Sequence, residues 1–452
     1  MRTFINCIKI LIFICLLWMT LYSLERLFIQ KSPESVIMDE FLALDENTVD
    51  LLCVGSSHAY TSCNTEVYWN DFGIPAFCIS GPSQPAANSY YYIKEAFKTQ
   101  KPKVVLLEAS CLHVQYVPNE YVVVNNVAWM PYSGDRASAL KGTVADGTLR
   151  GNLEWNISYF HDRWTGLNNR DFEYVLGNYR IGTKGFNPWW NYADYTNVLT
   201  VWDTEYKMEP PEENIEYVNK IIALCEENEA KLVVYVSPHD IDEVTYGFIN
   251  WYRDYFAQNN IEMIDGIQLA HEIGIDPEVD LCHAHIGYAG AVKISEYIGN
   301  YLFDKGYVAD RRKEEGYEAW KKRSHYYDST AEIYSLVNIT DMESYLKELD
   351  SLNNNITIIL YNGETSYVRI LANNEVFEQL QTEVINYRNT VLDHEIEINM
   401  NEDKRVNILV DYDRITALNQ VMTENAIQIF VYNCISGEVV ENRVFYLEEE
   451  EL

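Results

Sequence analysis

Basic side chains are scarce in this chain of 452 residues: 34 lysines and arginines stand against 68 aspartates and glutamates, giving a formal net charge of −34. A surface with this much negative charge repels nucleic acid, whose backbone is itself anionic. No stretch of interleaved basic and aromatic residues offsets that repulsion. Nucleic-acid binding is therefore excluded, and the acidity by itself indicates only solubility.

Paired metal-ligand motifs are also lacking. Cys282, His283 and His285 lie close together, and Cys and His are the usual zinc ligands. However, no second Cys/His cluster stands at the spacing of a zinc finger. The nine cysteines show no paired spacing, so a disulfide such as Cys63–Cys111 is allowed without being indicated. We predict no metal and no cofactor, with a metal role for the Cys282–His285 cluster as the alternative.

A long charge-free apolar run occurs at the N-terminus, over residues 10–24, and it extends toward residue 4 past Lys9. Crossing a bilayer takes about 20 apolar residues, so a slightly short span is feasible. No small-x-small cleavage site follows the run, which favours an uncleaved signal anchor over a cleaved signal peptide. Arg2 and Lys9 favour a cytoplasmic N-terminus. Residues 1–30 are thus predicted to form a single-pass anchor, with the rest of the chain outside the cytoplasm.

Residues 31–304 alternate between strand and helix patterns. The strands are expected at 51–54, 76–79, 104–107, 231–236 and 262–264. The helices are expected at 65–72, 85–99, 213–228, 246–258 and 289–303. This alternation predicts an α/β fold with a doubly wound parallel sheet covered on both faces. In such sheets ligands bind at the carboxyl ends of the strands.

A serine turn and a distant histidine segment supply chemistry at that end of the sheet. Gly55-Ser56-Ser57 follows the first strand, and the glycine allows a sharp turn that leaves a serine at the strand end. Asp280, His283 and His285 follow more than two hundred residues later. A serine hydroxyl becomes a nucleophile when a histidine takes its proton and an acid orients that histidine.

The order of these segments resembles the SGNH (GDSL-like) hydrolase superfamily. The resemblance places the nucleophile on Ser57 and an oxyanion-hole N–H on Gly81, which follows the second strand. The family histidine precedes a glycine by five residues, and counting back from Gly290 gives His285. The family acid stands three residues before the histidine. That spacing pairs Asp280 with His283 instead, so His285 is the favoured base and His283 is the alternative.

The third family block, Gly-x-Asn-Asp, has no counterpart, because the strand at 104–107 runs into Glu108-Ala109-Ser110. Its loss is common in the polysaccharide-modifying branches that resemble the teichoic-acid alanylation and alginate acetylation proteins. The resemblance therefore implies a serine O-acyltransferase, most simply an acetyltransferase, acting on a cell-surface or exported polysaccharide. It also implies a membrane-bound acyl-transporting partner. The alternatives are a carbohydrate esterase and a catalytically silent glycan-binding or assembly protein.

An aromatic-rich insertion is expected at 112–208, where the strand–helix pattern stops. Trp189 and Trp190 stand in a Gly/Asn/Pro context that predicts an exposed loop. Aromatic faces stack on the apolar C–H faces of sugars, so these two residues are candidate substrate contacts. The alternative is that the insertion's aromatic rings only pack a subdomain.

The C-terminal third changes texture. Charged residues at 305–335 predict a helical linker, and β-type runs through 336–452 predict a separate β-rich (α+β) domain. Helical pieces are expected at 342–352 and 376–386. The runs from 407 to 445 are loosely similar to the ILEI/PANDER-like domains, which implies a binding role. An accessory domain without a ligand is the alternative.

Overall fold

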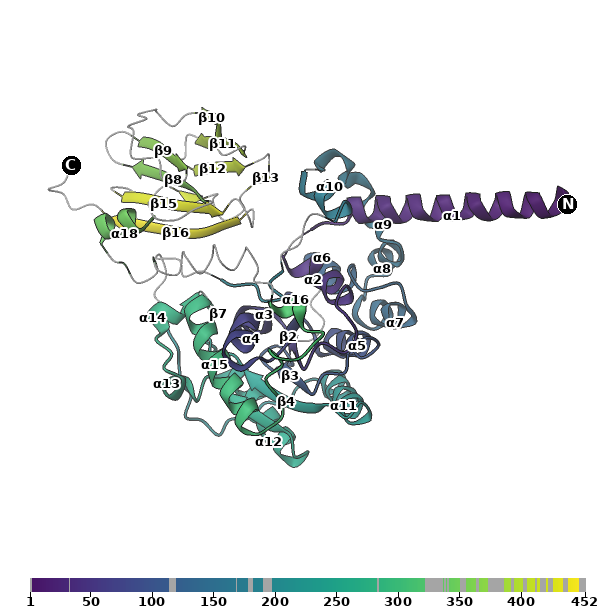
Figure 1. The fold of residues 1–452 in the computed structure, drawn as a ribbon. Helices are drawn as coiled ribbons and strands as arrows, with labels where there is room; N and C mark the ends of the chain where they lie inside the picture. The colour runs from purple at the N-terminus through teal and green to yellow at the C-terminus, as the bar shows by residue number, and fades with distance from the viewer. Residues whose placement is uncertain are drawn as a thin grey trace.

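In the computed structural model, residues 2–321 are described except 32, 114–118, 168, 178–181, 190–196 and 283. Beyond them it describes 336, 339, 341–349, 355–362, 366–372, 386–391, 394–400, 405–410, 413–414, 420–421, 426–433 and 438–446. Figure 1 shows an α/β body, a β-rich part and one projecting helix.

The projecting helix is α1 (Arg2–Phe28), formed by the apolar N-terminal run. Its stretch Phe4–Phe28 is long and apolar enough to cross a membrane. The helix is exposed along most of its length, and its last turns pack on the body of the protein. The sequence prediction of an apolar helix at the N-terminus is therefore confirmed, whereas its topology stays a prediction.

The body is built on a five-stranded parallel sheet with the order β2-β1-β3-β4-β5. The strands are β1 (Leu51–Gly55), β2 (Ala76–Ser80), β3 (Val104–Glu108), β4 (Lys231–Val236) and β5 (Glu262–Asp265). Strands β1, β2 and β3 are buried at every residue, because helices cover both faces of the sheet. The predicted α/β class with a parallel sheet is confirmed. The order turns back between β1 and β3, where such sheets bind their ligands.

Successive strand residues enter two separate cores, as the two-residue period of a strand requires. One core holds Leu52, Val54 and their counterparts, covered by α2 (Pro33–Leu42), α5 (Ala86–Ala96), α11 (Glu212–Glu227) and α12 (Glu243–Gln258). The other holds Leu51, Cys53 and their counterparts, covered by α3 (Ser57–Ser62), α4 (Thr65–Phe72) and α15 (Tyr288–Asp304). The second core lies beneath the serine turn.

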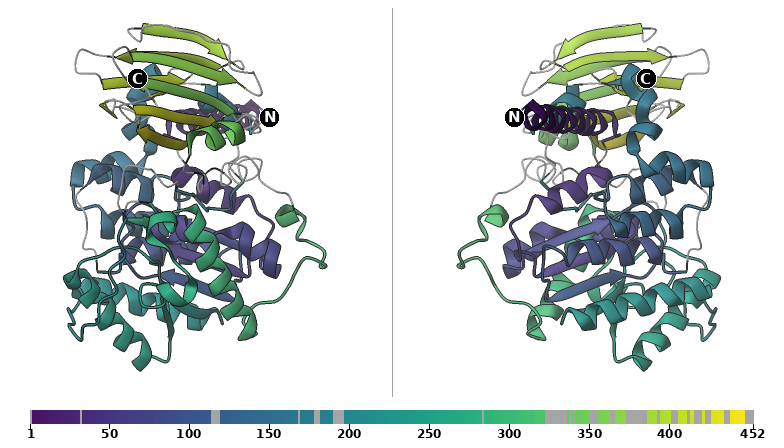
Figure 2. Two further views of the ribbon diagram at one scale, coloured as in Figure 1. Left: turned by 90° about the vertical axis from the view of Figure 1, so that its left-hand side faces the viewer. Right: turned by 90° about the vertical axis from the view of Figure 1, so that its right-hand side faces the viewer.

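The aromatic-rich insertion forms short helices rather than extended loops. They are α6 (Glu120–Val127), α7 (Gly134–Thr143), α8 (Gly147–Glu154), α9 (Asn156–Phe160), the 3₁₀ helix η1 (His161–Gly166) and α10 (Asn169–Val175). Three of them begin at side chains that cap the first turn, namely Asn119, Ser133 and Asp146. Figure 2 shows the insertion at one side of the sheet, and its last three helices, α9, η1 and α10, contact α1.

The described C-terminal residues form two antiparallel sheets. One has the order β16-β15-β8-β9 and the other β10-β11-β12-β13, with β14 paired to β12. Their bounds are β8 (Asn355–Asn362), β9 (Ser366–Ala372), β10 (Asn386–Val391), β11 (His394–Met400), β12 (Arg405–Val410), β13 (Asp413–Arg414), β14 (Gln420–Val421), β15 (Ala426–Asn433) and β16 (Glu438–Tyr446). Helix α18 (Met342–Leu349) precedes them, where a helix was expected.

The predicted linker helix does not form in the described part of 305–335, which has turns and one short helix, α16 (Glu318–Lys321). Gly306 and Gly316 adopt positive φ values of 68° and 92° there, which interrupts a right-handed helix. The helix expected at 376–386 falls outside the described residues except at Asn386, which begins β10.

Candidate active site

Ser57 stands on a tight turn between β1 and α3. It is the first residue of α3, and the Ser56 side chain caps the helix by accepting from the His58 backbone N–H at 3.3 Å. The turn is close-packed: Gly55 and Ser56 are buried, whereas Ser57 is partly exposed. The strand therefore delivers one accessible hydroxyl at the carboxyl edge of the sheet.

Gly55 has no room for a side chain. A Cβ on it would lie 2.6 Å from Glu108 Cβ and 3.0 Å from Ala59 Cβ. We expect Gly55→Ala to lower the free energy of unfolding by about 1–3 kcal/mol through overpacking. It should also lower the rate of acetyl-ester hydrolysis about 10²-fold, because the displaced turn carries Ser57 out of position. The matched control is Gly134→Ala, whose new Cβ would meet nothing within 4 Å. Equal urea midpoints for the two variants would contradict the packing argument.

His285 comes to Ser57 on a two-stranded hairpin. Strands β6 (Leu281–Cys282) and β7 (His285–Ile286) pair antiparallel between α14 (Pro277–Asp280) and α15. The imidazole Nε2 of His285 lies 2.7 Å from Ser57 Oγ, a hydrogen-bond distance. Both residues are partly exposed, so a reactant has access to them.

A buried serine, Ser295, links the end of α3 to α15 by hydrogen bonds. Ser295 on α15 accepts from the backbone N–H of Asn64 at 2.8 Å and donates to the carbonyl of Ser62 at 2.8 Å. Helix α3 begins at Ser57 and α15 follows the His285 hairpin, so this bridge fixes Ser57 relative to the His285 imidazole. Sequence reasoning did not identify Ser295, because an isolated serine in a helix carries no distinctive signal.

The Asp280 carboxylate is fully buried, but its hydrogen bonds do not run to His285. Its Oδ2 accepts from the Lys293 ammonium and, at 2.7 Å, from the backbone N–H of Asp276. Its backbone carbonyl accepts from Gly287 N–H at 2.7 Å, which closes the hairpin that holds His285. The expected carboxylate–imidazole hydrogen bond is thus replaced by a link through the backbone, because the acid lies five residues before the histidine rather than three.

Cys282 takes the register position opposite His285. The two residues are Cα partners in the β6–β7 pair, and directly opposed side chains of an antiparallel pair lie on the same face. Cys282 is also three residues before His285, where the resemblance places the acid. A buried cysteine therefore stands at the sequence position where the resemblance predicts the acid of the triad.

Gly81 follows β2, whose last residue, Ser80, pairs in register with Gly55. The glycine therefore reaches the same edge of the sheet, one residue beyond that pair. A Cβ on Gly81 would lie 2.3 Å from Asn126 Oδ1. Asn126, fully buried on α6, holds the turn by donating to the Pro82 carbonyl at 2.9 Å. The insertion thus supports the candidate oxyanion loop, which sequence reasoning did not foresee.

A stack of imidazoles lies behind the Ser57–His285 pair. The ring of His58 lies 4.4 Å from that of His285 at an interplanar angle of 16°, and 4.0 Å from that of His239 at 33°. Burial lowers the pKa of His58 well below its usual value and lowers the pKa of His239 to about 4. Both rings are therefore neutral at pH 7. Neutral neighbours let His285 accept a proton without facing a second positive charge.

Trp189 is the one described member of the predicted aromatic pair. Its ring centroid lies 4.1 Å from that of His285, and its carbonyl accepts from the Tyr288 N–H at 2.8 Å. It is half-buried at the site rather than fully exposed in a loop. Trp190 and His283 lie outside the described residues.

Glu108 is a buried carboxyl beneath the serine turn. Its Oε1 accepts from the hydroxyl and, at 3.0 Å, from the backbone N–H of Ser110, and from Ser237 N–H at 3.3 Å. Its Oε2 lies 3.5 Å from Ser56 Oγ. Burial outweighs these hydrogen bonds and raises the pKa of Glu108 to about 7. The residue joins the ends of β1, β3 and β4 on the site's inner side.

The pKa values of Glu108 and His239 make opposing contributions to stability. The folded pKa of Glu108 is raised from 4.5 to about 7, so its contribution is present below pH 4.5 and is lost as the pH rises through 7. The folded pKa of His239 is lowered from 6.5 to about 4, so its contribution is present above pH 6.5 and is lost as the pH falls toward 4.

Glu108→Gln should remove the first contribution. We expect the variant to gain stability relative to the parent by about 3 kcal/mol between pH 4.5 and pH 7.5, since each pKa unit corresponds to about 1.4 kcal/mol. Urea unfolding at several pH values measures the difference. A constant offset between the two proteins across this range would contradict the raised pKa of Glu108.

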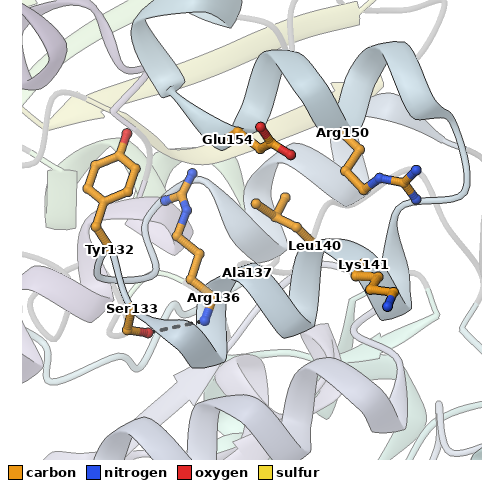
Figure 3. Close-up of a pocket in the computed structure, with 8 residues that line it drawn as sticks. All are labelled: Tyr132, Ser133, Arg136, Ala137, Leu140, Lys141, Arg150 and Glu154. Carbon is orange, nitrogen blue, oxygen red and sulfur yellow. Dashed lines mark hydrogen bonds between the residues drawn. The ribbon is translucent and has the colours of Figure 1, made fainter.

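A cavity of about 390 Å³ lies away from these residues, on α7 and α8. It is lined by Tyr132, Ser133, Arg136, Ala137, Leu140, Lys141, Arg150 and Glu154 (Figure 3). None of the predicted site residues lines it. The buried Arg136 guanidinium is committed to structure, because it donates to the carbonyls of Ala128, Met130 and Leu153.

No protein-family model matches this chain, and no curated protein matches it. Solved structures do match. A candidate acylhydrolase from Bacteroides fragilis is 8% identical, with a TM-score of 0.33 over 62% of this chain and 100% of that chain. A gut microbial diltiazem-metabolizing enzyme is 10% identical, with a TM-score of 0.28 over 58% of this chain and 47% of that chain, about half its length. At these identities and TM-scores, neither likeness assigns a function to this chain. The case for a function therefore rests on the geometry around Ser57.

Proposed function

We propose that this protein is a serine enzyme that transfers acyl groups, with Ser57 as nucleophile and His285 as base. The observation that carries the proposal is the 2.7 Å distance between Ser57 Oγ and His285 Nε2. Nucleophile and base within hydrogen-bond reach, open to solvent at the carboxyl edge of a parallel sheet, is the arrangement that covalent acyl transfer requires.

The reaction divides into two halves. Ser57 Oγ attacks the acyl carbon of a donor ester while its proton moves to His285 Nε2. The tetrahedral intermediate then collapses, the donor alkoxide leaves with that proton, and acyl-Ser57 remains. In the second half His285 takes the proton of an acceptor hydroxyl, the acceptor oxygen attacks the acyl carbon, and Ser57 recovers its proton.

The backbone N–H groups of Ser57 and Gly81 are assigned to the oxyanion. Both follow strands that are neighbours in register, so their amides lie at one edge of the sheet. Donors aimed at the developing negative charge commonly contribute about 10²–10³-fold to the rate. The crowding of Gly81 by Asn126 keeps this loop in place before the substrate arrives.

Asp280 is assigned a positioning role for the histidine hairpin. Its carboxylate pairs with Lys293 and its carbonyl closes the turn before His285. The ring of His285 itself contacts Trp189 and the neutral His58. The face of an indole ring attracts a cation, so the contact with Trp189 favours the imidazolium that forms during the reaction. His283 remains the alternative base.

The acceptor is proposed to be a cell-surface or exported polysaccharide and the acyl group acetyl. An apolar helix of membrane-spanning length and an aromatic ring, Trp189, at the reacting pair support this choice. With residues 31–452 outside the cytoplasm, an acyl donor made inside the cell needs a membrane-bound transporting partner. Residues 336–452 are proposed as an ILEI/PANDER-like accessory domain that binds glycan.

The test is an acyl-transfer assay with the full-length protein, p-nitrophenyl acetate as donor and oligosaccharides as acceptors. Acetylated sugar that requires Ser57 supports the transferase. Release of free acetate alone would favour the alternative, a carbohydrate esterase. The two reactions differ only in the second half, where water rather than a sugar hydroxyl takes the acyl group. If the donor is not consumed above the rate of Ser57→Ala, the protein is a catalytically silent glycan-binding or assembly protein.

A further inference from the structure

Helix α1 changes its surroundings along its length. Its apolar side chains from Phe4 to Met19 are largely exposed, and packing against the body begins at Leu21. At 1.5 Å per residue, the exposed stretch of residues 4–20 is about 25 Å long, close to the hydrocarbon thickness of a bilayer. The point where packing begins therefore marks the level at which the helix would leave the lipid.

The body holds the last turns of α1 at three places. Glu25 Oε1 accepts from Tyr132 Oη at 2.7 Å and from Asn156 Nδ2 at 2.9 Å. The Arg26 guanidinium donates to Tyr174 Oη and pairs with the Asp39 carboxylate. These contacts connect the helix end to α9 and α10, which Figure 1 shows around the base of α1.

The third contact involves the backbone at the end of α1. Arg163 in η1 donates to the carbonyls of Phe28 at 3.1 Å and Ile29 at 3.2 Å. The same guanidinium pairs with both carboxylate oxygens of Asp171, at 2.9 and 3.0 Å. Asp171 also pairs with the buried Lys31. The helix is thus fixed to the body rather than tethered by a flexible connector.

Exposed apolar side chains are sequence neighbours of three of these contact residues, Asn156, Arg163 and Tyr174. Trp155 precedes Asn156 and Trp164 follows Arg163, and they are 48% and 66% exposed. Tyr174 stands among three further exposed residues of the α10 region, namely Phe172, Val175 and Leu176. These five side chains, here called the collar, stand on or next to α9, η1 and α10, the insertion elements that contact α1.

We propose that the collar lies in the headgroup layer of the lipid bilayer that α1 crosses. Tryptophan is enriched at membrane–water interfaces, where its ring has one apolar and one polar side. Single exposed apolar residues are ordinary on soluble proteins, but five on the elements that contact a helix of membrane-spanning length indicate a surface made for lipid. Trp155 and Trp164 thus have a proposed role in lipid contact that is separate from the glycan role expected of Trp189 and Trp190.

The collar sets the position of the whole body on the membrane, and only its consequence for acyl transfer rests on the proposed function. A chain fixed to its anchor and seated by a collar holds the Ser57–His285 pair at a set height and orientation over the membrane. An acyl donor presented by a membrane partner would then reach the site without a search by a mobile domain.

The test uses the full-length protein in nanodiscs of plain or brominated phosphatidylcholine, since bromine quenches tryptophan fluorescence on contact. The measured quantity is the part of the tryptophan emission that bromine quenches. Trp164→Phe should lower it by the contribution of one of the ten tryptophans. The loss should be larger with bromine near the headgroup end of the acyl chain than near the terminal methyl. The control is Trp251→Phe on α12, whose ring stacks on Tyr255 in the body and should leave the quenched share unchanged.

Identical quenched shares in the parent and Trp164→Phe would overturn the collar. Stronger quenching of Trp164 by the deeper bromine would overturn its placement in the headgroup layer. A chain that does not enter nanodiscs would overturn both the anchor and the collar. None of these outcomes depends on acyl transfer, so they are distinguishable from a failure of the proposed function.

Discussion

Ser57→Ala is expected to lower the turnover of an acetyl ester by about 10³-fold or more, because the variant has no oxygen that can become acylated. The loss should appear in kcat rather than in KM, since the hydroxyl acts on the reacting carbon. Stability should change little, because the side chain is partly exposed. The measurement is the initial rate of p-nitrophenyl acetate hydrolysis, accompanied by mass spectrometry of the intact protein to detect acyl-Ser57.

The adjacent serine provides a matched control. Ser56 is buried, caps α3 and has its hydroxyl 3.5 Å from Glu108, away from the reactant. Ser56→Ala should cost about 1 kcal/mol of stability through the lost cap and retain most of the activity. If the two serine variants lost activity equally, Ser57 would have no special role and the acyl-serine mechanism would fail.

His285→Ala is expected to reduce activity to a similar extent, about 10³-fold, because Ser57 loses the base 2.7 Å from its hydroxyl. The substitution also leaves a space beside Trp189 and His58 in which free imidazole fits. Added imidazole should therefore restore part of the rate, and the restored rate should rise with pH as more imidazole becomes neutral. A structural role for His285 would give no such rescue.

Variants of two further histidines distinguish the base from residues that only surround it. His271 is exposed on α13 (Ala270–Ile273) and is not part of the Ser57–His285 pair, so His271→Gln should behave as the parent does. His58→Phe keeps an aromatic ring against His285 and should lower kcat by no more than about tenfold, consistent with a positioning residue. A loss from His58→Phe as large as that from His285→Ala would instead make His58 the base.

The strands and most helices of the body followed from the sequence because their signals are local. The expected strand at 231–236 is β4 (Lys231–Val236), and the expected helix at 65–72 is α4 (Thr65–Phe72). Apolar runs of strand length and polar caps are readable from neighbouring residues alone. The insertion was harder, because its short helices are stabilised by tertiary contacts such as those of buried Arg136.

The candidate site shows the same division. Counting back from Gly290 selected His285, the residue that the structure brings to Ser57. The role of the Asp280 carboxylate was not readable, because whether a buried acid faces an imidazole or a lysine depends on how the hairpin and α15 pack. His58, His239 and Glu108 were overlooked as site residues, since stacking and burial join positions far apart in the chain.

The sequence by itself determined the apolar helix, the parallel-sheet body and the residue types that meet at its carboxyl edge, because hydrophobic period and turn chemistry act over a few residues. Only the tertiary structure decided that the His285 imidazole lies 2.7 Å from the Ser57 hydroxyl, what surrounds that imidazole and which apolar side chains remain exposed on the elements that contact α1. Those features depend on contacts between segments that are distant in the sequence. The pattern of residues along the chain does not give the distances between such segments after folding.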